Sequence, residues 1–223
     1  MPTHRSEDDI RADYRRAMGD ELGEVMFLLW HDLTWLYFEW HQYKELFGSH
    51  QSRIDIMNES APRFFASLDR VLWQDILLSI SRLADPPATS GQQNLAFRRF
   101  VRLIPPDGPQ AEFLKALDTF ETDAQFARGW RHTRFAHRDL DHASDSEANP
   151  LPFASRASVT KALASAAQVL NTLELHYCDS TTGYEYVSDP IGGAPDLLHI
   201  IDRGLAAKRE DEDSNRYWEP RPQ

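Results

Sequence analysis

The chain has almost no cysteine: Cys178 is the only one among its 223 residues. A single thiol forms no intrachain disulfide and no thiolate metal cluster, so neither a disulfide-stabilised fold nor a zinc ribbon is expected. Such sparse cysteine is typical of proteins in a reducing compartment. We therefore expect a cytoplasmic protein whose fold depends on one hydrophobic core.

The chain also lacks a long apolar segment. Its most apolar run, Val25–Phe38, contains His31 and Asp32, and it is shorter than the about 20 apolar residues of a membrane-spanning helix. The N-terminal residues are charged and contain no apolar signal-peptide core. We expect no membrane partner, and we predict that Val25–Phe38 belongs to a buried helix.

Positive charge is in deficit. The chain has 24 Lys and Arg against 35 Asp and Glu, which gives a formal net charge of −11. Proteins that coat nucleic acid through bulk charge are basic, so this class is excluded. The net charge does not exclude a local basic site on an acidic protein.

Signatures of several enzyme classes are missing as well. The sequence has no GxSxG nucleophile elbow, and Gly192-Gly193 lacks the Lys and Ser or Thr of a P-loop. His137, Asp139 and His142 are conceivable metal ligands, but no second cluster with zinc-like spacing accompanies them. We therefore expect neither a metal nor a cofactor.

What the sequence does contain is helical periodicity. Apolar residues recur at spacings of three and four, which is typical of amphipathic helices. The pattern is clearest in four segments: residues 20–47, 62–85, 109–138 and 155–177. Alternating strands, internal repeats and sustained heptads are absent. The predicted fold is all-α, an up-and-down four-helix bundle with additional short helices.

The segments outside these helices lead to further expectations. We expect one domain over residues 1–207, with its core at about 20–177, and a charged flexible tail over 208–223. A short helix is predicted over Leu95–Ile104, and a short extended segment over Tyr184–Val187.

One segment concentrates the reactive side chains. Trp130–His142 holds three arginines, three histidines and two aspartates in thirteen residues. If this segment is one helix, five of its side chains share an arc of roughly 120°: Arg131, Arg134, His137, Arg138 and Asp141. An imidazole exchanges protons near neutral pH, and a guanidinium binds phosphate and stabilises charge on it. These groups suffice for cleavage of RNA through its own 2′-hydroxyl without a metal.

A simpler interpretation fits the same residues. Arginines and histidines at helical spacing commonly form a solvated surface, with ion pairs to nearby carboxylates such as Asp139 and Asp141. Residue types alone leave both interpretations open.

The segment resembles a known family. Arg131–His137 is similar to the Arg-X4–6-His motif of HEPN domains, and its extension RFAHRDLDH resembles the AbiU2-like group related to bacterial abortive-infection proteins. The resemblance includes SRLAD (Ser81–Asp85) and NLAFRRFV (Asn94–Val101), and it covers about Asp20 to Tyr177.

This resemblance implies a HEPN helical bundle, commonly a homodimer whose two motifs face each other. Active members are metal-independent endoribonucleases of toxin–antitoxin or phage-defence systems. RNA is then the implied substrate, an antitoxin protein is a candidate partner, and no DNA is expected. By position, Arg131 and His137 would be the catalytic pair, and His132 would orient the site. Helix geometry adds three supporting or phosphate-binding residues: Arg134, Arg138 and Asp141.

Two alternatives remain beside the nuclease. In some HEPN proteins the fold is a non-catalytic interaction module, and here the motif helix would form a dimer seam with paired charges. Alternatively, the same arginines would line a nucleotide-binding cleft. Two motif helices that face each other across an open, basic cleft favour the nuclease, whereas Arg131 in a salt bridge and an inaccessible His137 favour the module.

Overall fold

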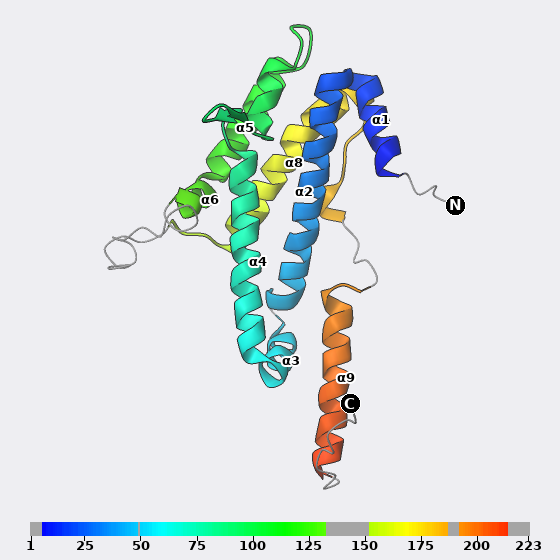
Figure 1. Cartoon of the computed structure of the whole chain (residues 1–223), viewed down its shortest axis with the longest axis vertical. Helices are drawn as coiled ribbons and strands as arrows, with labels where there is room; N and C mark the ends of the chain where they lie inside the picture. The colour runs from blue at the N-terminus through cyan, green and yellow to red at the C-terminus, as the bar shows by residue number, and fades with distance from the viewer. Residues whose placement is uncertain (1–5, 49, 133–151, 187–191, 214–223) are drawn as a thin grey trace. The chain divides into compact units, whose positions relative to one another are not determined.

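The computed structural model describes residues 6–48, 50–132, 152–186 and 192–213. The described elements in chain order are α1 (Glu7–Met18), α2 (Asp20–Phe47), α3 (Gln51–Ser60), α4 (Pro62–Leu83), β1 (Ala88–Thr89), β2 (Gln92–Gln93), the 3₁₀ helix η1 (Phe97–Arg102), α5 (Gln110–Asp123), α6 (Gln125–Trp130), α8 (Arg156–Cys178), the 3₁₀ helix η3 (Tyr184–Tyr186) and α9 (Ala194–Asp213). Figure 1 shows these elements along the chain. The prediction of an all-α fold is confirmed.

The chain divides into two compact units. Unit 1 comprises residues 1–37 and 74–187, and unit 2 comprises residues 38–73 and 188–223. Two helices, α2 and α4, contribute residues to both units. Within the described residues, no helix has the length and apolar character needed to cross a membrane.

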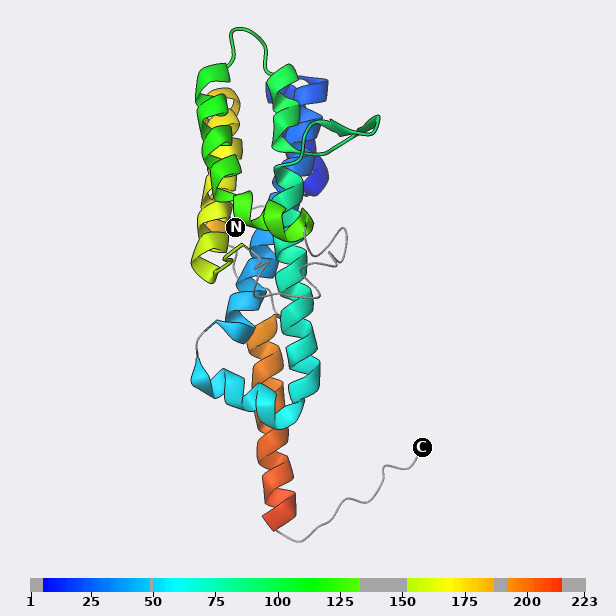
Figure 2. The same cartoon turned by 90° about the vertical axis from the view of Figure 1, so that its left-hand side faces the viewer.

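The core of unit 1 is built around α5 and α8, which lie side by side in both views (Figures 1 and 2). η1 packs on α5 through two edge-to-face aromatic pairs, Phe97–Phe120 with ring centroids 5.0 Å apart and Phe100–Phe113 with centroids 5.7 Å apart. All four rings are fully buried. Such pairs add about 0.5–1.5 kcal/mol each to the burial of the rings, so they fix η1 firmly on α5.

α1 is attached to α8 by a buried polar contact. Its N-terminus has a capping box, in which Ser6 and Asp9 satisfy each other's backbone N–H groups. The Tyr14 hydroxyl then donates to the carboxylate of Glu174 on α8, and both residues are buried. Burial and the negative charge of Glu174 raise the pKa of Tyr14, so the phenol stays protonated and remains the donor.

The helix predicted over residues 109–138 is interrupted. α5 ends at Asp123, and α6 begins at Gln125 after Ala124, whose backbone has φ −89° and ψ −2°. Ala124 is fully buried, and its N–H still bonds to the Phe120 carbonyl at 2.8 Å. The turn therefore changes the helix direction while the Ala124 N–H keeps its own backbone hydrogen bond. The apolar periodicity is weakest at this position, around Glu121–Ala124.

Two further predictions are corrected in detail. The helix expected over Leu95–Ile104 is the shorter 3₁₀ helix η1, and the extended segment expected from Tyr184 is the 3₁₀ helix η3. Of the segment expected to be a charged flexible tail, residues 208–213 are helical as the end of α9, and the remainder lies outside the described residues. An ion pair between neighbouring turns supports this helical extension: Lys208 Nζ lies 3.8 Å from Glu212 Oε1.

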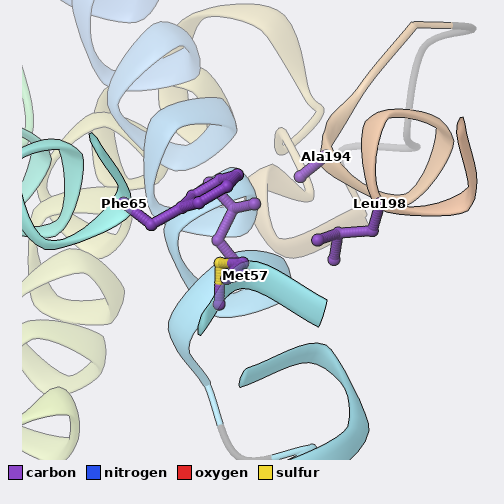
Figure 3. Close-up of a cluster of buried hydrophobic side chains, with 5 residues drawn as sticks. Met57, Phe65, Ala194 and Leu198 are labelled. Carbon is purple, nitrogen blue, oxygen red and sulfur yellow. The ribbon is translucent and has the colours of Figure 1, made fainter. Parts of the chain in front are cut away.

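Unit 2 has its own apolar cluster, formed where α3, α9 and the adjoining ends of α2 and α4 meet. Figure 3 shows the side chains of Met57, Phe65, Ala194 and Leu198 directed toward one another. Polar contacts reinforce the cluster: Gln42 Oε1 accepts the backbone N–H of Ala194 at 2.6 Å. Arg209 of α9 forms an ion pair with Glu59 of α3.

Candidate functional site

α6 leads into the reactive segment and ends at its first residue, Trp130. The helical backbone continues past Trp130 into Arg131, which has φ −59° and ψ −47°. Arg131 and His132 have π-helical backbone, the start of a wider turn. Side chains three positions apart in a helix share a face, so Gln125, Arg128 and Arg131 are neighbours on one side of this segment.

These side chains form one wall of an open cleft of about 490 Å³ in unit 1. The other wall comes from the end of α4 and the turn that follows it; α6 lies beside this end of α4 in Figures 1 and 2. The lining residues are Ser81, Asp85, Gln125, Arg128, Arg131 and His132. Two guanidinium groups therefore face one carboxylate, and the cleft lining is basic although the chain has a net charge of −11.

Arg131 is tied to the opposite wall of the cleft. Its Nη1 donates to Asp85 Oδ1 at 2.5 Å, and the two side chains are 38% and 20% exposed. An ion pair with this much exposure adds at most about 1 kcal/mol to stability. Its main effect is geometric, because it fixes the direction of a guanidinium that carries five N–H donors and uses one of them on Asp85.

Arg128 and His132 differ from Arg131. Both are exposed, and in the described part of the chain neither side chain takes part in a hydrogen bond or ion pair. A guanidinium in this state presents its full fork to solvent, which suits bidentate binding of a phosphate. The cleft thus combines one anchored arginine with one unanchored arginine.

A comparison with protein-family models assigns the chain. The HEPN family model described as AbiU2 matches residues 19–194, a range that includes both walls of the cleft. The chain belongs to this HEPN family. It is a family associated with abortive infection. The comparisons with curated proteins and with solved structures gave no match.

In this HEPN protein the structure places part of the predicted site. Arg131 and His132 line the cleft, as a shared site requires. The remaining predicted site residues lie outside the described residues: Arg134, His137, Arg138 and Asp141. The ion pair of Arg131 agrees with one criterion for an interaction module. The cleft is open and basic, as the nuclease requires, but it lies between α4 and α6 of one chain, so it does not test whether two motif helices face each other.

Four cleft residues were not predicted as site residues. Ser81 and Asp85 belong to the SRLAD segment, which carried part of the HEPN resemblance but no assigned role. Arg128 and Gln125 lie one and two turns before Arg131 on the same face. Extending the helical-face argument toward the N-terminus would have found these two.

Among the described residues, no group of three or more His, Cys, Asp and Glu side chains is arranged to hold a metal ion. His137, Asp139 and His142, the metal ligands considered from the sequence, lie outside the described residues.

Pro152 packs against α6 at Gly129 and Trp130. The indole N–H of Trp130 donates to the Pro152 carbonyl at 2.8 Å, and Ala127 is fully buried beneath the helix. The space beside Gly129 is filled by the proline ring: a Cβ at position 129 would lie 2.5 Å from Pro152 Cγ. Gly129 is therefore what allows Pro152 to sit close against α6.

We expect Gly129→Ala to destabilise the protein by about 1 kcal/mol, because the overlap with Pro152 outweighs the about 1 kcal/mol that alanine gains over glycine in a helix. The matched control is Gly204→Ala in α9, where a Cβ meets nothing within 4 Å; it should stabilise by about 0.5–1 kcal/mol. Urea unfolding of both variants measures the difference. Equal stabilisation by the two substitutions would contradict the role given to Gly129.

Proposed function

We propose that this HEPN protein is an endoribonuclease that cleaves RNA through the RNA's own 2′-hydroxyl. The observation that carries the proposal is the open cleft in which Asp85 holds Arg131 beside Arg128 and His132. Such a cleft offers positive charge and oriented N–H donors at one place, and the family assignment supports the same chemistry.

In the proposed reaction, a base removes the proton of the 2′-hydroxyl, whose oxygen attacks the adjacent phosphorus. The bond from phosphorus to the 5′-oxygen breaks, and an acid protonates the departing oxygen. Arg131 stabilises the negative charge that builds on the phosphoryl oxygens. His137 is the proposed general base or acid, since an imidazole serves both steps near neutral pH.

The proposal has three associated parts. The protein acts as a homodimer, it acts in a toxin–antitoxin or phage-defence system, and an antitoxin protein restrains it. DNA is not a substrate, because it lacks the 2′-hydroxyl nucleophile. The family's association with abortive infection supports this setting.

We expect the purified wild type to cleave single-stranded RNA in the presence of EDTA, leaving a 2′,3′-cyclic phosphate on one product and a 5′-hydroxyl on the other. A single 2′-deoxy nucleotide at the cleaved position should block that cleavage. Gel analysis and end-group mapping measure both results. An Arg131→Ala protein purified in parallel controls for contaminating ribonuclease; equal degradation by both preparations would refute the proposal.

The second candidate is a non-catalytic interaction module, favoured by the ion pair between Arg131 and Asp85. It predicts no cleavage by the wild type and no toxicity when the protein is expressed in a bacterial host. Growth of cells that express the wild type or His137→Ala therefore distinguishes the two candidate functions. If the protein is a nuclease, the wild type arrests growth and His137→Ala does not.

A further inference from the structure

We propose that Arg128 and Gln125 form a second substrate subsite, which binds the phosphate and nucleotide next to the scissile position. This inference rests on the proposed RNA cleavage and adds residues that lie outside the Arg131–His137 motif. It is carried by the juxtaposition of an unanchored arginine, an exposed amide and the anchored Arg131 along one face of α6, inside one cleft.

The two arginines of the cleft are in different states. Arg131 gives one N–H to Asp85, which fixes its direction. Arg128 is exposed, and in the described part of the chain its guanidinium has no hydrogen bond or ion pair. A guanidinium that stabilises a reacting phosphate benefits from a fixed direction. A guanidinium that binds a flanking phosphate of a flexible RNA strand benefits from being able to move with it. This difference assigns the reacting phosphate to Arg131 and a flanking phosphate to Arg128.

Spacing along α6 gives the subsite its direction. Gln125, Arg128 and Arg131 follow one another at intervals of three residues, so their side chains form a continuous line on the helix surface. A bound strand with its reacting phosphate at Arg131 would meet Arg128 and then Gln125 on the way along the helix. The Gln125 amide is both a donor and an acceptor, which suits the edge of a base.

The charge of the residues that line the cleft favours an anionic ligand. Asp85 is the only carboxylate among the six lining residues, and it is already bound to Arg131. Arg128 therefore adds a positive charge that the cleft does not compensate within the described residues. On a chain with a net charge of −11, an uncompensated arginine inside a cleft is a local attraction for phosphate.

The test measures binding of a fluorescent single-stranded RNA whose 2′-hydroxyls are methylated, so that it cannot be cleaved by the proposed chemistry. We expect Arg128→Ala to weaken binding about tenfold, which is typical for losing one charge-assisted hydrogen-bonded contact. The slope of log affinity against log salt should fall by about 0.7, the value for one phosphate contact on a single strand. Gln125→Ala should weaken binding less and leave the slope unchanged, because it removes no charge.

Arg102→Ala is the matched control, since Arg102 is exposed on η1 and does not line the cleft; it should leave affinity and slope near wild type. Arg128→Lys keeps the charge and loses the fork, so we expect the wild-type slope with intermediate affinity. Circular dichroism of each variant checks the fold.

The outcomes distinguish this inference from the proposed function. If Arg128→Ala binds as Arg102→Ala does, while the wild type still cleaves unmodified RNA in an Arg131-dependent manner, the subsite is wrong and the nuclease stands. If the wild type neither binds the methylated RNA nor cleaves the unmodified one, both are overturned. Loss of affinity in Arg128→Lys as large as in Arg128→Ala, with an unchanged salt slope in both, would also refute the phosphate contact.

Discussion

Arg131→Ala is expected to lower kcat/KM for RNA cleavage by about 10³-fold, which removal of a transition-state charge stabiliser typically costs. The loss should fall mainly on kcat, because the charge that Arg131 stabilises builds up during the reaction. Arg131→Lys should recover only a small part of the activity, since a single ammonium cannot replace the two-point geometry of the guanidinium. Single-turnover cleavage with saturating enzyme isolates this step.

Asp85 determines how well Arg131 is oriented, so its substitution should act through Arg131. Asp85→Ala removes the acceptor of the Nη1 hydrogen bond and leaves the guanidinium free to move. We expect a loss of about 10- to 10²-fold in kcat, in line with small misplacements of catalytic groups. Asp85→Asn keeps an acceptor oxygen at the same place and should retain most of the activity.

A double-mutant cycle checks this coupling. In the Arg131→Ala background, Asp85→Ala should have almost no further effect, because the group that it orients is gone. Asp118→Ala is the matched control, an exposed carboxylate on α5 that does not line the cleft. If Asp85→Asn instead tightened RNA binding and raised kcat/KM, Asp85 would be a competitor of the phosphate, and the positioning role would be wrong.

The long helices were predictable because their periodicity is local. Leu29 and Leu33 in α2, and Ile76 and Ile80 in α4, are four residues apart and fully buried, as the spacing predicts. The looser spacing around Glu121–Ala124 marked the region of the interruption, but it did not predict a turn, because alanine is itself a strong helix former. What decides it is the burial of Ala124 against the rest of unit 1, which is a tertiary effect.

The site divides in the same way. Arg131 and His132 follow from a short motif, and Arg128 from the phase of one helix. Asp85 is separated from Arg131 by 46 positions, and its pairing depends on how α4 and α6 are brought together. A sequence pattern shows which residues are neighbours within one helix. To predict a contact between two helices, one must also know how the helices are arranged in the fold.

Glu174 shows this limit most clearly and leads to the second large effect. It is 4% exposed and lies on the apolar face of α8, four residues after the buried Leu170, although a glutamate is mostly found at the surface. One partner is distant in the chain: the Tyr14 hydroxyl of α1 donates to Oε1. The other, Thr182, follows the end of α8 and donates to the carboxylate through both its backbone N–H and its hydroxyl, each at 2.9 Å. Asn171 also bonds to the backbone of Thr182: its Oδ1 accepts the same N–H at 2.9 Å, and its Nδ2 donates to the carbonyl at 3.1 Å.

We expect Glu174→Ala to lower the free energy of unfolding by about 3 kcal/mol. The substitution leaves the hydroxyls of Tyr14 and Thr182 without this acceptor, whereas the Thr182 N–H keeps Asn171 Oδ1 at 2.9 Å. Each donor that loses its acceptor at a buried site typically costs about 1–3 kcal/mol before the surroundings relax. Tyr14→Phe removes only one of these bonds and should cost about 1–2 kcal/mol. Urea unfolding followed by circular dichroism measures both losses.

The matched control is Gln168→Ala, an exposed polar side chain on the same helix, which should change stability by at most about 0.5 kcal/mol. The two network substitutions should not add: in the Glu174→Ala background, Tyr14→Phe removes a hydroxyl that has already lost its acceptor, so it should be nearly neutral or stabilising. Additive losses, or a Glu174→Ala protein as stable as wild type, would show that this carboxylate does not attach α1 to α8. Because Glu174 does not line the cleft, a folded Glu174→Ala protein should still bind RNA. RNA binding by this variant would show that the network around Glu174 contributes to stability and not to the proposed chemistry.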